Sequence, residues 1–297
     1  MPRPPLGYAL TVAAAGLFAV NGTVSTLALQ AGIPAPWLTA LRCGGAAVVL
    51  LTVLAAVAPA RLRVSWREVP FLAAFGVVGI ALVFEMTAPV FIALWVWLVR
   101  GERVRRRLWA ALGLSLSGLT LVAEVWTGGG GLDVVGVVAA LAAALCLATY
   151  YLMGERGTAT RDPVALTCWS FVAAGLFWAV AAPFWPFDPA VLRTSVPVSL
   201  GSLELPLWAL VGWIVVLGAV LPFWLSLAAL RHLPPTTAGL VATVEPVLAS
   251  VVAWLWVEQV LSGWQVLGGI VVLVGIGLAQ TARTAREPAP VPEPAPA

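Results

Sequence analysis

The chain has 297 residues, of which 61% are hydrophobic and only 10% are charged, and its mean hydropathy is +1.00. A soluble domain carries about a quarter charged residues, so this composition excludes a soluble globular protein and predicts an integral membrane protein. The net charge of +3 does not indicate nucleic-acid binding, because all positive side chains are arginines and most lie in short loops between apolar runs.

Apolar runs near the ~20 residues that cross a bilayer recur along the whole chain. Backbone polar groups in lipid must pair within their own segment, so runs this long and numerous must be helices. The predicted spans are 7–29, 36–58, 108–126, 134–153, 163–183, 206–229, 236–257 and 261–280, with one odd run at 69–99. Residues 184–206 form a predicted extramembrane loop, and residues 281–297 a disordered tail rich in Pro and Ala.

The odd run at 69–99 is too long for one crossing and too short for two. If it returns to the side from which it enters, fourteen of the sixteen arginines lie on the side of the N-terminus, whereas a single crossing leaves five there. The positive-inside rule therefore favours a re-entrant hairpin with its tip around residues 84–86. A single long, tilted helix remains the alternative.

Internal similarity divides the chain into two halves. Residues 34–42 resemble 161–169, and residues 85–102 resemble 242–259. The sequence thus predicts a first repeat at 1–126 and a second at 133–280. Five helices in the second repeat place the two in opposite orientations, the inverted repeat common among transporters.

The two predicted repeats differ in length at one place. Gly79 and Pro89 are ten positions apart, whereas Gly218 and Pro246 are 28 positions apart. The first repeat has therefore lost about eighteen residues, the length of the tip of one helical hairpin, by comparison with the second.

The repeated segments resemble the EamA domain family of the drug/metabolite transporter (DMT) superfamily. The resemblance rests on "EMTAPVFIALWVWLVRGE" and "VEPVLASVVAWLWVEQVLSGWQVLGGIVVLVGIGL", covers residues 7–280, and is greatest to the threonine/homoserine-exporter branch. It implies an all-α membrane fold of two inverted EamA-like repeats, with about eight full transmembrane helices plus the shortened hairpin, nine or ten helices in all. It also implies a multi-pass protein of the bacterial cytoplasmic membrane with both termini cytoplasmic.

Three charged residues lie deep within predicted membrane-spanning segments, where charges are costly and mark transport pathways. Glu85 and Glu245 could carry a proton or attract an ammonium group of an amino-acid-like substrate. Arg42 could receive the carboxylate of that substrate through its guanidinium fork. The structural alternative is that Arg42 pairs with one of these acids and holds the two halves together.

Other candidates for the pathway are polar or aromatic. Asn21 and Tyr150 hold matching places in the first helix of each half, and Trp169 takes the place of Arg42 in the second half. Interhelical hydrogen bonding is the alternative role for the polar pair. Pro89 and Pro246 interrupt matching helices and are hinge candidates, because proline frees backbone carbonyl groups.

These features predict a secondary transporter that exports or exchanges small metabolites, such as amino acids, by alternating access of the two repeats. The expected partners are a small-molecule substrate, protons as a further candidate, and the lipid bilayer; no catalytic residue, metal site, cofactor or nucleic acid is expected. A transport-inactive or scaffold-like remnant is the alternative, because of the shortened hairpin. An intramembrane enzyme is disfavoured, because no H-E-x-x-H, D-x-x-D or G-x-S-x-G motif occurs.

Overall fold

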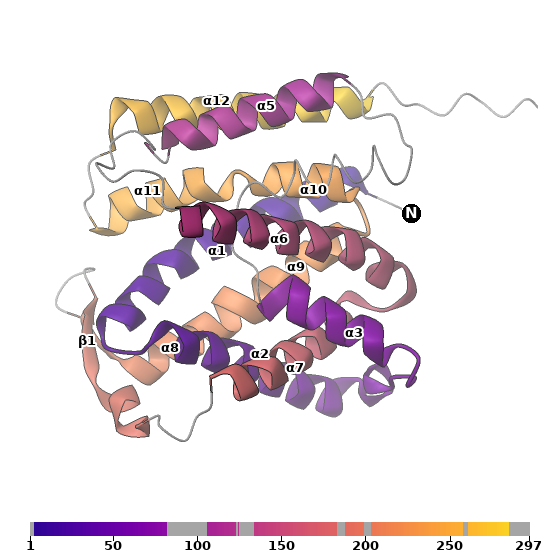
Figure 1. Ribbon diagram of the computed structural model, residues 1–297, viewed down its shortest axis with the longest axis vertical. Coiled ribbons are helices and arrows are strands. Elements are labelled where there is room, and N and C mark those ends of the chain that lie inside the picture. The colour runs from indigo at the N-terminus through magenta and orange to yellow at the C-terminus, as the bar shows by residue number, and fades with distance from the viewer. Residues whose placement is uncertain are drawn as a thin grey trace, which may run out of the picture.

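The computed structural model of the chain describes residues 3–81, 106–122, 124, 134–182, 188–198, 203–257 and 261–284. The helices in these ranges form one bundle, in which most lie roughly parallel or antiparallel to one another (Figure 1). Helices α5 and α12 form a pair along one side of the bundle, and α2, α3 and α7 gather on the opposite side.

The first half of the chain contributes four described helices and two short turns. These are α1 (Pro4–Gln30), α2 (Ala35–Val57), the 3-10 turn η1 (Pro59–Leu62), α3 (Val69–Gly76), the π-helical turn η2 (Val77–Ala81) and α5 (Arg106–Val122). Helices α1, α2 and α3 each carry a proline in the first two positions, where its missing N–H group costs no helical hydrogen bond.

The second half contributes the remaining elements. These are α6 (Val134–Thr160), α7 (Pro163–Ala181), the 3-10 turn η3 (Pro189–Arg193), β1 (Ser195–Val198), β2 (Leu203–Pro206), α8 (Leu207–Val215), the π-helical turn η4 (Val216–Val220), α9 (Leu221–Ala229), α10 (Pro235–Ala242), α11 (Glu245–Val257) and α12 (Gly263–Thr284). The turn between α6 and α7 is fixed by Asp162, whose carboxylate accepts a hydrogen bond from the Val164 N–H at 3.2 Å.

The prediction of an all-α membrane protein is confirmed. In the described part of the chain, five helices are long and apolar enough to cross a membrane: Pro4–Gln30, Ala35–Val57, Pro163–Ala181, Leu207–Ala229 and Pro235–Trp256. Eight full spans remain a prediction.

The structure refines three boundaries. The predicted loop 184–206 contains η3 and a small antiparallel hairpin that pairs Ser195 with Pro206. Helix α6 continues to Thr160, seven residues past its predicted end, because its charged residues end the apolar run but not the helix. Helix α12 continues to Thr284, and the tail from residue 285 lies outside the described residues.

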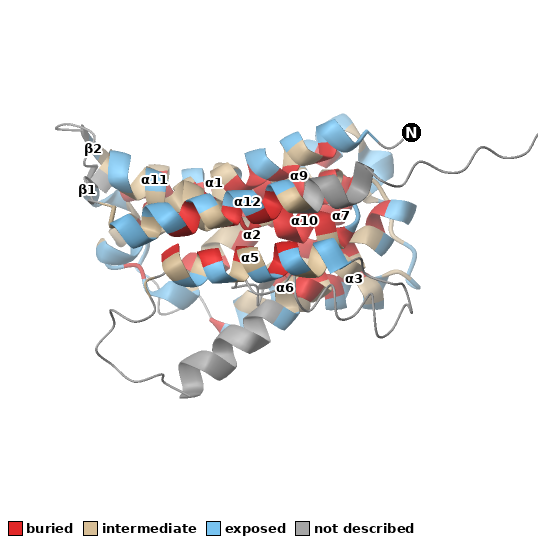
Figure 2. Cartoon of the chain, turned by 90° about the horizontal axis from the view of Figure 1, so that it is seen from above, coloured by how far each residue is buried: buried red, intermediate tan, exposed pale blue. Residues whose placement is uncertain are grey.

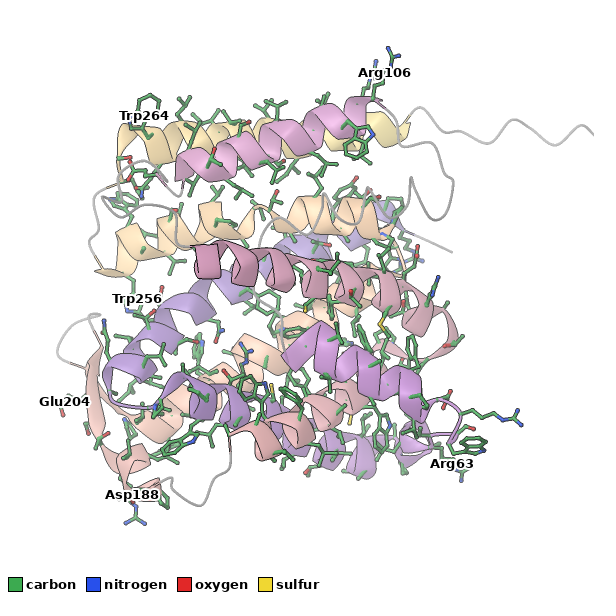
Figure 3. All side chains as sticks on the ribbon, viewed as in Figure 1. Arg63, Arg106, Asp188, Glu204, Trp256 and Trp264 are labelled. Atoms are coloured by element: carbon green, nitrogen blue, oxygen red, sulfur yellow. The ribbon has the colours of Figure 1, made fainter. Side chains whose placement is uncertain are left out.

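The two ends of the bundle differ in composition. Arg63 and Arg106 lie at one end, and Asp188 and Glu204 lie at the other (Figure 3). We call the first the arginine end, defined by Arg61, Arg63, Arg106, Arg161 and Arg231, and the second the hairpin end, defined by the turn at 31–34, η3 and β1–β2. The first residue of α1 and the last of α12 both lie at the arginine end (Figure 1).

The odd run 69–99 lies only partly within the described residues. Helix α3 enters the bundle at the arginine end, and α5 begins at Arg106 at that same end (Figures 1 and 3). The described flanks of this run therefore both lie at the arginine end. The hairpin tip and the helix predicted after it lie in 82–105, outside the described residues.

Glycines allow the closest helix contacts. A β-carbon at Gly118 of α5 would lie 2.7 Å from Val272 of α12, and one at Gly175 of α7 would lie 3.3 Å from Gly44 of α2. The first pair joins the last helices of the two halves, and the second pair joins their second helices. Buried residues concentrate in the middle of the bundle and toward the end where the N-terminus lies (Figure 2).

Candidate functional site

A cavity of about 380 Å³ lies inside the bundle, with a lining supplied by α1, α2, α6, α8, α9, α10 and α11. The exposure of its lining increases along α1, from Thr11 at 2% to Leu29 at 41%. The buried part of the cavity thus lies toward the arginine end, and its exposed part toward the hairpin end. A volume of this size is typical of a pocket for a small molecule.

Four of the pathway residues predicted from the sequence line this cavity: Asn21, Arg42, Tyr150 and Glu245. Of the described lining residues, only Arg42 and Glu245 are charged. No ion pair joins these two within the described chain, so the structure does not show the direct pairing of Arg42 with Glu245.

The two charges lie at different depths. Arg42 lies seven residues into α2, about 10 Å from the hairpin end of that helix at 1.5 Å per residue. Glu245 lies ten residues after the start of α10, about 15 Å from the arginine end. The charged groups of the cavity are therefore distributed unevenly along the bundle axis. The guanidinium of Arg42 lies nearer the hairpin end, and the carboxyl group of Glu245 lies nearer the arginine end.

Arg42 and Asn21 each carry a polar atom that is unsatisfied in the described part of the protein. Nε of Arg42 and Oδ1 of Asn21 are both buried and have no hydrogen-bond partner among the described residues. The Arg42 guanidinium does contact the side chain of its neighbour Cys43. Unpaired buried polar atoms are rare in native structures, and each calls for an explanation such as a bound ligand.

Tyr150 is held by several neighbours. Its hydroxyl donates a hydrogen bond to the Phe223 carbonyl at 3.2 Å and also bonds the Ser226 side chain. Its ring stacks on Phe75 at 5.5 Å and meets Phe223 edge-on at 5.6 Å. These contacts make Tyr150 a rigid wall of the cavity.

The membrane-spanning segment 235–256 is interrupted beside the cavity. Helix α10 ends at Ala242, two residues form a turn, and α11 begins at Glu245 and Pro246. Because Pro246 has no N–H group, the carbonyl of Ala242 loses its usual helical donor. Ala242, Thr243 and Glu245 all line the cavity, so the interruption places polar groups there.

The remaining predicted residues lie elsewhere. Trp169 does not line the cavity; it packs against the core, and its buried Nε1 has no hydrogen-bond partner within the described chain. Trp169 takes the place of Arg42 in the alignment of the two halves, and its role in the pathway stays a prediction. Glu85 and Pro89 lie outside the described residues.

The sequence did not indicate several polar lining residues: Thr11, Ser25, Thr39, Ser226 and Thr243. Thr11, Thr39 and Thr243 bond carbonyls of the preceding turn in their own helices, as hydroxyls in any membrane helix do. No spacing distinguishes them from other hydroxyls, so only the fold identifies them.

Ionic contacts join three turns at the arginine end. The Arg161 guanidinium binds the Glu68 carboxylate at 2.6 Å and the Arg63 carbonyl at 3.1 Å. Arg61 pairs with Asp162 at 3.3 Å, and Arg231 donates to the Arg161 carbonyl at 3.2 Å. The Ser65 N–H and the Arg161 guanidinium hold the pKa of Glu68 below its ordinary value. We call this set, Arg61, Arg63, Glu68, Arg161, Asp162 and Arg231, the ionic network.

Comparisons with known proteins agree with this architecture. Residues 134–281 match the EamA-like transporter family. The chain is 28% identical over 211 residues to the threonine/homoserine exporter RhtA of Salmonella typhimurium (strain LT2), covering 71% of this chain and 64% of that protein. It is 28% identical over 207 residues to RhtA of Escherichia coli (strain K12), covering 69% and 63%. The matched part thus spans less than two thirds of the length of these relatives.

Two further similarities are more distant. An uncharacterized transporter of Synechocystis, sll1319, is 26% identical over 201 residues, covering 67% of this chain and 58% of that protein. One crystal structure aligns with a TM-score of 0.73 at 19% identity, covering 96% of this chain and 100% of the other, which shows a shared fold. On its family match, the second half of the chain, residues 134–281, belongs to the EamA-like transporter family, and the chain resembles threonine/homoserine exporters.

Proposed function

We propose that the protein is a secondary transporter that exports or exchanges amino acids or similar small metabolites across the bacterial cytoplasmic membrane. The cavity is the observation that carries this proposal. It is enclosed by membrane helices from both halves, and its described lining holds one cation and one carboxyl group, Arg42 and Glu245. Charges are costly in a bilayer and persist where they serve transport.

The charge pattern of the cavity favours a zwitterionic substrate. A guanidinium binds a carboxylate through two parallel hydrogen bonds, and Arg42 has an unpaired Nε donor to offer. Glu245 would attract an ammonium group or exchange a proton, which would couple transport to a proton gradient. The relatives named threonine/homoserine exporters make these two amino acids the first substrates to test.

The proposal includes alternating access by two inverted repeats, residues 1–126 and 133–280. Gly79 and Gly218 are each the third residue of a π-helical turn, in the third helix of their respective halves. A β-carbon at Gly79 would lie 3.3 Å from Cα of Tyr150, and one at Gly218 would overlap Asn21. Each third helix therefore contacts the first helix of the other half, and this crossed arrangement supports the proposed inverted repeat. Pro246 is the proposed hinge of the second repeat, and Pro89 of the first.

The orientation follows from the arginines. The positive-inside rule places the arginine end, with the start of α1 and the end of α12, on the cytoplasmic side. On this orientation the buried part of the cavity lies toward the cytoplasm, and its exposed part toward the opposite side. The ionic network then closes the cytoplasmic end.

The test is transport in proteoliposomes. Labelled threonine and homoserine are supplied with and without a pH gradient, to the wild type and to the Arg42→Ala and Glu245→Gln variants. Because Arg42 supplies the carboxylate site, Arg42→Ala is expected to lower transport at least tenfold, the effect of losing one charge-assisted hydrogen bond of about 1.5–3 kcal/mol. Glu245→Gln is expected to abolish the stimulation of transport by the pH gradient.

Two exposed residues of the hairpin end provide matched controls, Arg193→Gln and Glu204→Gln, and neither is expected to change transport. If the pH gradient still stimulates transport by the Glu245→Gln variant as it does for the wild type, Glu245 does not couple transport to protons. If the wild type moves none of the amino acids tested, and gains transport when about eighteen residues are inserted into the 79–89 segment, the alternative of an inactive remnant is correct.

A further inference from the structure

Gly218 forms a socket for a side chain of the other half. It is the third residue of the π-helical turn η4, it is buried, and the Asn21 side chain occupies the space beside its α-carbon. A β-carbon at Gly218 would overlap Oδ1 of Asn21 and lie 2.5 Å from its Cγ. No side chain other than hydrogen fits there while Asn21 keeps its position. The socket therefore fixes where the Asn21 amide lies.

The amide held in this socket is incompletely bonded. Asn21 is 7% exposed, and its Oδ1 has no hydrogen-bond partner in the described part of the protein. Leaving a buried acceptor unpaired costs about 1–3 kcal/mol, so a purely structural amide would be expected to have a partner. Asn21 lines the cavity, where a ligand can supply the missing donor.

The position of Asn21 along the bundle matches that of Arg42. Asn21 lies nine residues before the end of α1, about 14 Å from the hairpin end, and Arg42 lies about 10 Å from it. Both residues line the cavity, and each has one polar atom without a partner among the described residues. The acceptor of Asn21 and the donor of Arg42 thus complement each other at one level of the cavity.

The counterpart of the socket in the first half serves a different purpose. A β-carbon at Gly79 would meet Cα of Tyr150, and the Tyr150 hydroxyl already donates to the Phe223 carbonyl. That contact is complete without a ligand. The Gly218 socket is the one that holds an unsatisfied polar group.

We infer that Asn21 is a specificity-determining residue that accepts a hydrogen bond from an N–H or O–H group of the substrate, and that Gly218 is its positioning residue. This inference rests on the proposed transport through the cavity. It predicts that Gly218 affects substrate recognition only through Asn21.

The test is a double-mutant cycle of Asn21→Ala, Gly218→Ala and N21A/G218A in proteoliposomes, with threonine and homoserine as probes. Asn21→Ala is expected to raise KM about tenfold with Vmax changed less than twofold, as for one lost hydrogen bond. Gly218→Ala displaces the amide and is expected to raise KM as much. The double variant, in which the overlap is relieved, is expected to match Asn21→Ala alone.

Gly212→Ala is the matched control, because Gly212 lies in the same membrane-spanning segment and a β-carbon there meets nothing within 4 Å. It is expected to leave KM unchanged. Additive effects of the two single variants, or an unchanged KM in Asn21→Ala, would overturn the inference. If Gly218→Ala misfolds and N21A/G218A folds, the overlap with Asn21 is the cause of the misfolding. The KM of the folded double variant then reports on recognition alone.

A second measurement does not depend on transport. If Asn21 awaits a ligand, replacing it with alanine removes an unsatisfied group, and the melting temperature of the ligand-free protein should stay the same or rise. If Asn21 instead joins helices, the melting temperature should fall by several degrees, and the inference fails. A wild type that transports neither probe contradicts the proposed function, and this melting experiment still decides the role of Asn21.

Discussion

The helices are held together by different kinds of contact at the two ends of the bundle. At the hairpin end, buried apolar side chains of α1, α2, α8 and the turn at 31–34 form one cluster: Val24, Ala28, Ile33, Leu38, Leu207, Leu210 and Ile214. At the arginine end, the ionic network joins the turns after α2, α6 and α9. Apolar burial is non-directional, whereas charge pairs near the surface depend on geometry, pH and salt.

This difference suggests how the two ends would move. The network consists of a few partly exposed contacts of small individual energy, so it can be broken and remade at low cost. The apolar cluster holds α1, α2 and α8 together over a larger buried area. On the proposed mechanism the arginine end opens by exchanging these charge pairs with water, while the apolar cluster keeps α1, α2 and α8 together at the hairpin end.

The largest effect is expected from the apolar cluster. Leu207 is fully buried there, so Leu207→Ala should lower the free energy of unfolding by about 2–5 kcal/mol through lost burial and a new cavity. Thermal unfolding in detergent measures this loss. Leu176→Ala is the control, because Leu176 is 66% exposed and should change stability by less than about 0.5 kcal/mol. Equal losses in both variants would show that the cluster has no special role.

A smaller effect is expected from the ionic network. The Arg161 side chain is 13% exposed, whereas its partner Glu68 is 44% exposed, so solvent screens much of the attraction. Arg161→Ala should therefore cost about 1–2 kcal/mol of unfolding free energy, including the lost bond to the Arg63 carbonyl. The melting curve should respond to salt less than that of the wild type. Arg193→Ala, at the hairpin end, should show no loss; a loss equal to that of Arg161→Ala would contradict the comparison.

The smallest effect is a pH dependence confined to the arginine end. The pKa of Glu68 is lowered in the folded protein, by the Ser65 N–H and by Arg161. A lowered pKa contributes stability that is present above the ordinary glutamate pKa and is lost as pH falls through the folded pKa. Wild type and Glu68→Gln should therefore differ in melting temperature near neutral pH and converge in acid. A difference that grows on acidification would have the wrong sign.

The sequence predicted the general organisation well, because that organisation follows from composition and charge. Apolar runs between arginines indicated the spans, and the arginine count indicated that 69–99 returns to its own end. Asn21, Arg42 and Glu245 were identifiable because polar groups are rare in membrane helices. Their common cavity was not, since the sequence does not show which helix faces meet.

Other features required the structure. The π-helical turns at 77–81 and 216–220 consist of ordinary apolar residues and leave no pattern in the sequence. The packing of Trp169 against the core also required the structure, because alignment of the two halves gives the position of a residue along a helix but not the direction of its side chain. The ionic network was also not predicted, because Glu68 and Arg161 are 93 residues apart and meet only through the packing of α3 on α7.

The unequal partners of Gly79 and Gly218 have a consequence for the ligand. A cavity with perfect twofold symmetry would accept an asymmetric molecule in two equivalent poses, and neither pose would be favoured. Here one glycine meets an amide with a free acceptor, and the other meets a tyrosine whose hydroxyl is already bonded. The two poses are therefore no longer equivalent. A bound asymmetric molecule is expected to prefer one orientation in the cavity, because its two ends meet different groups.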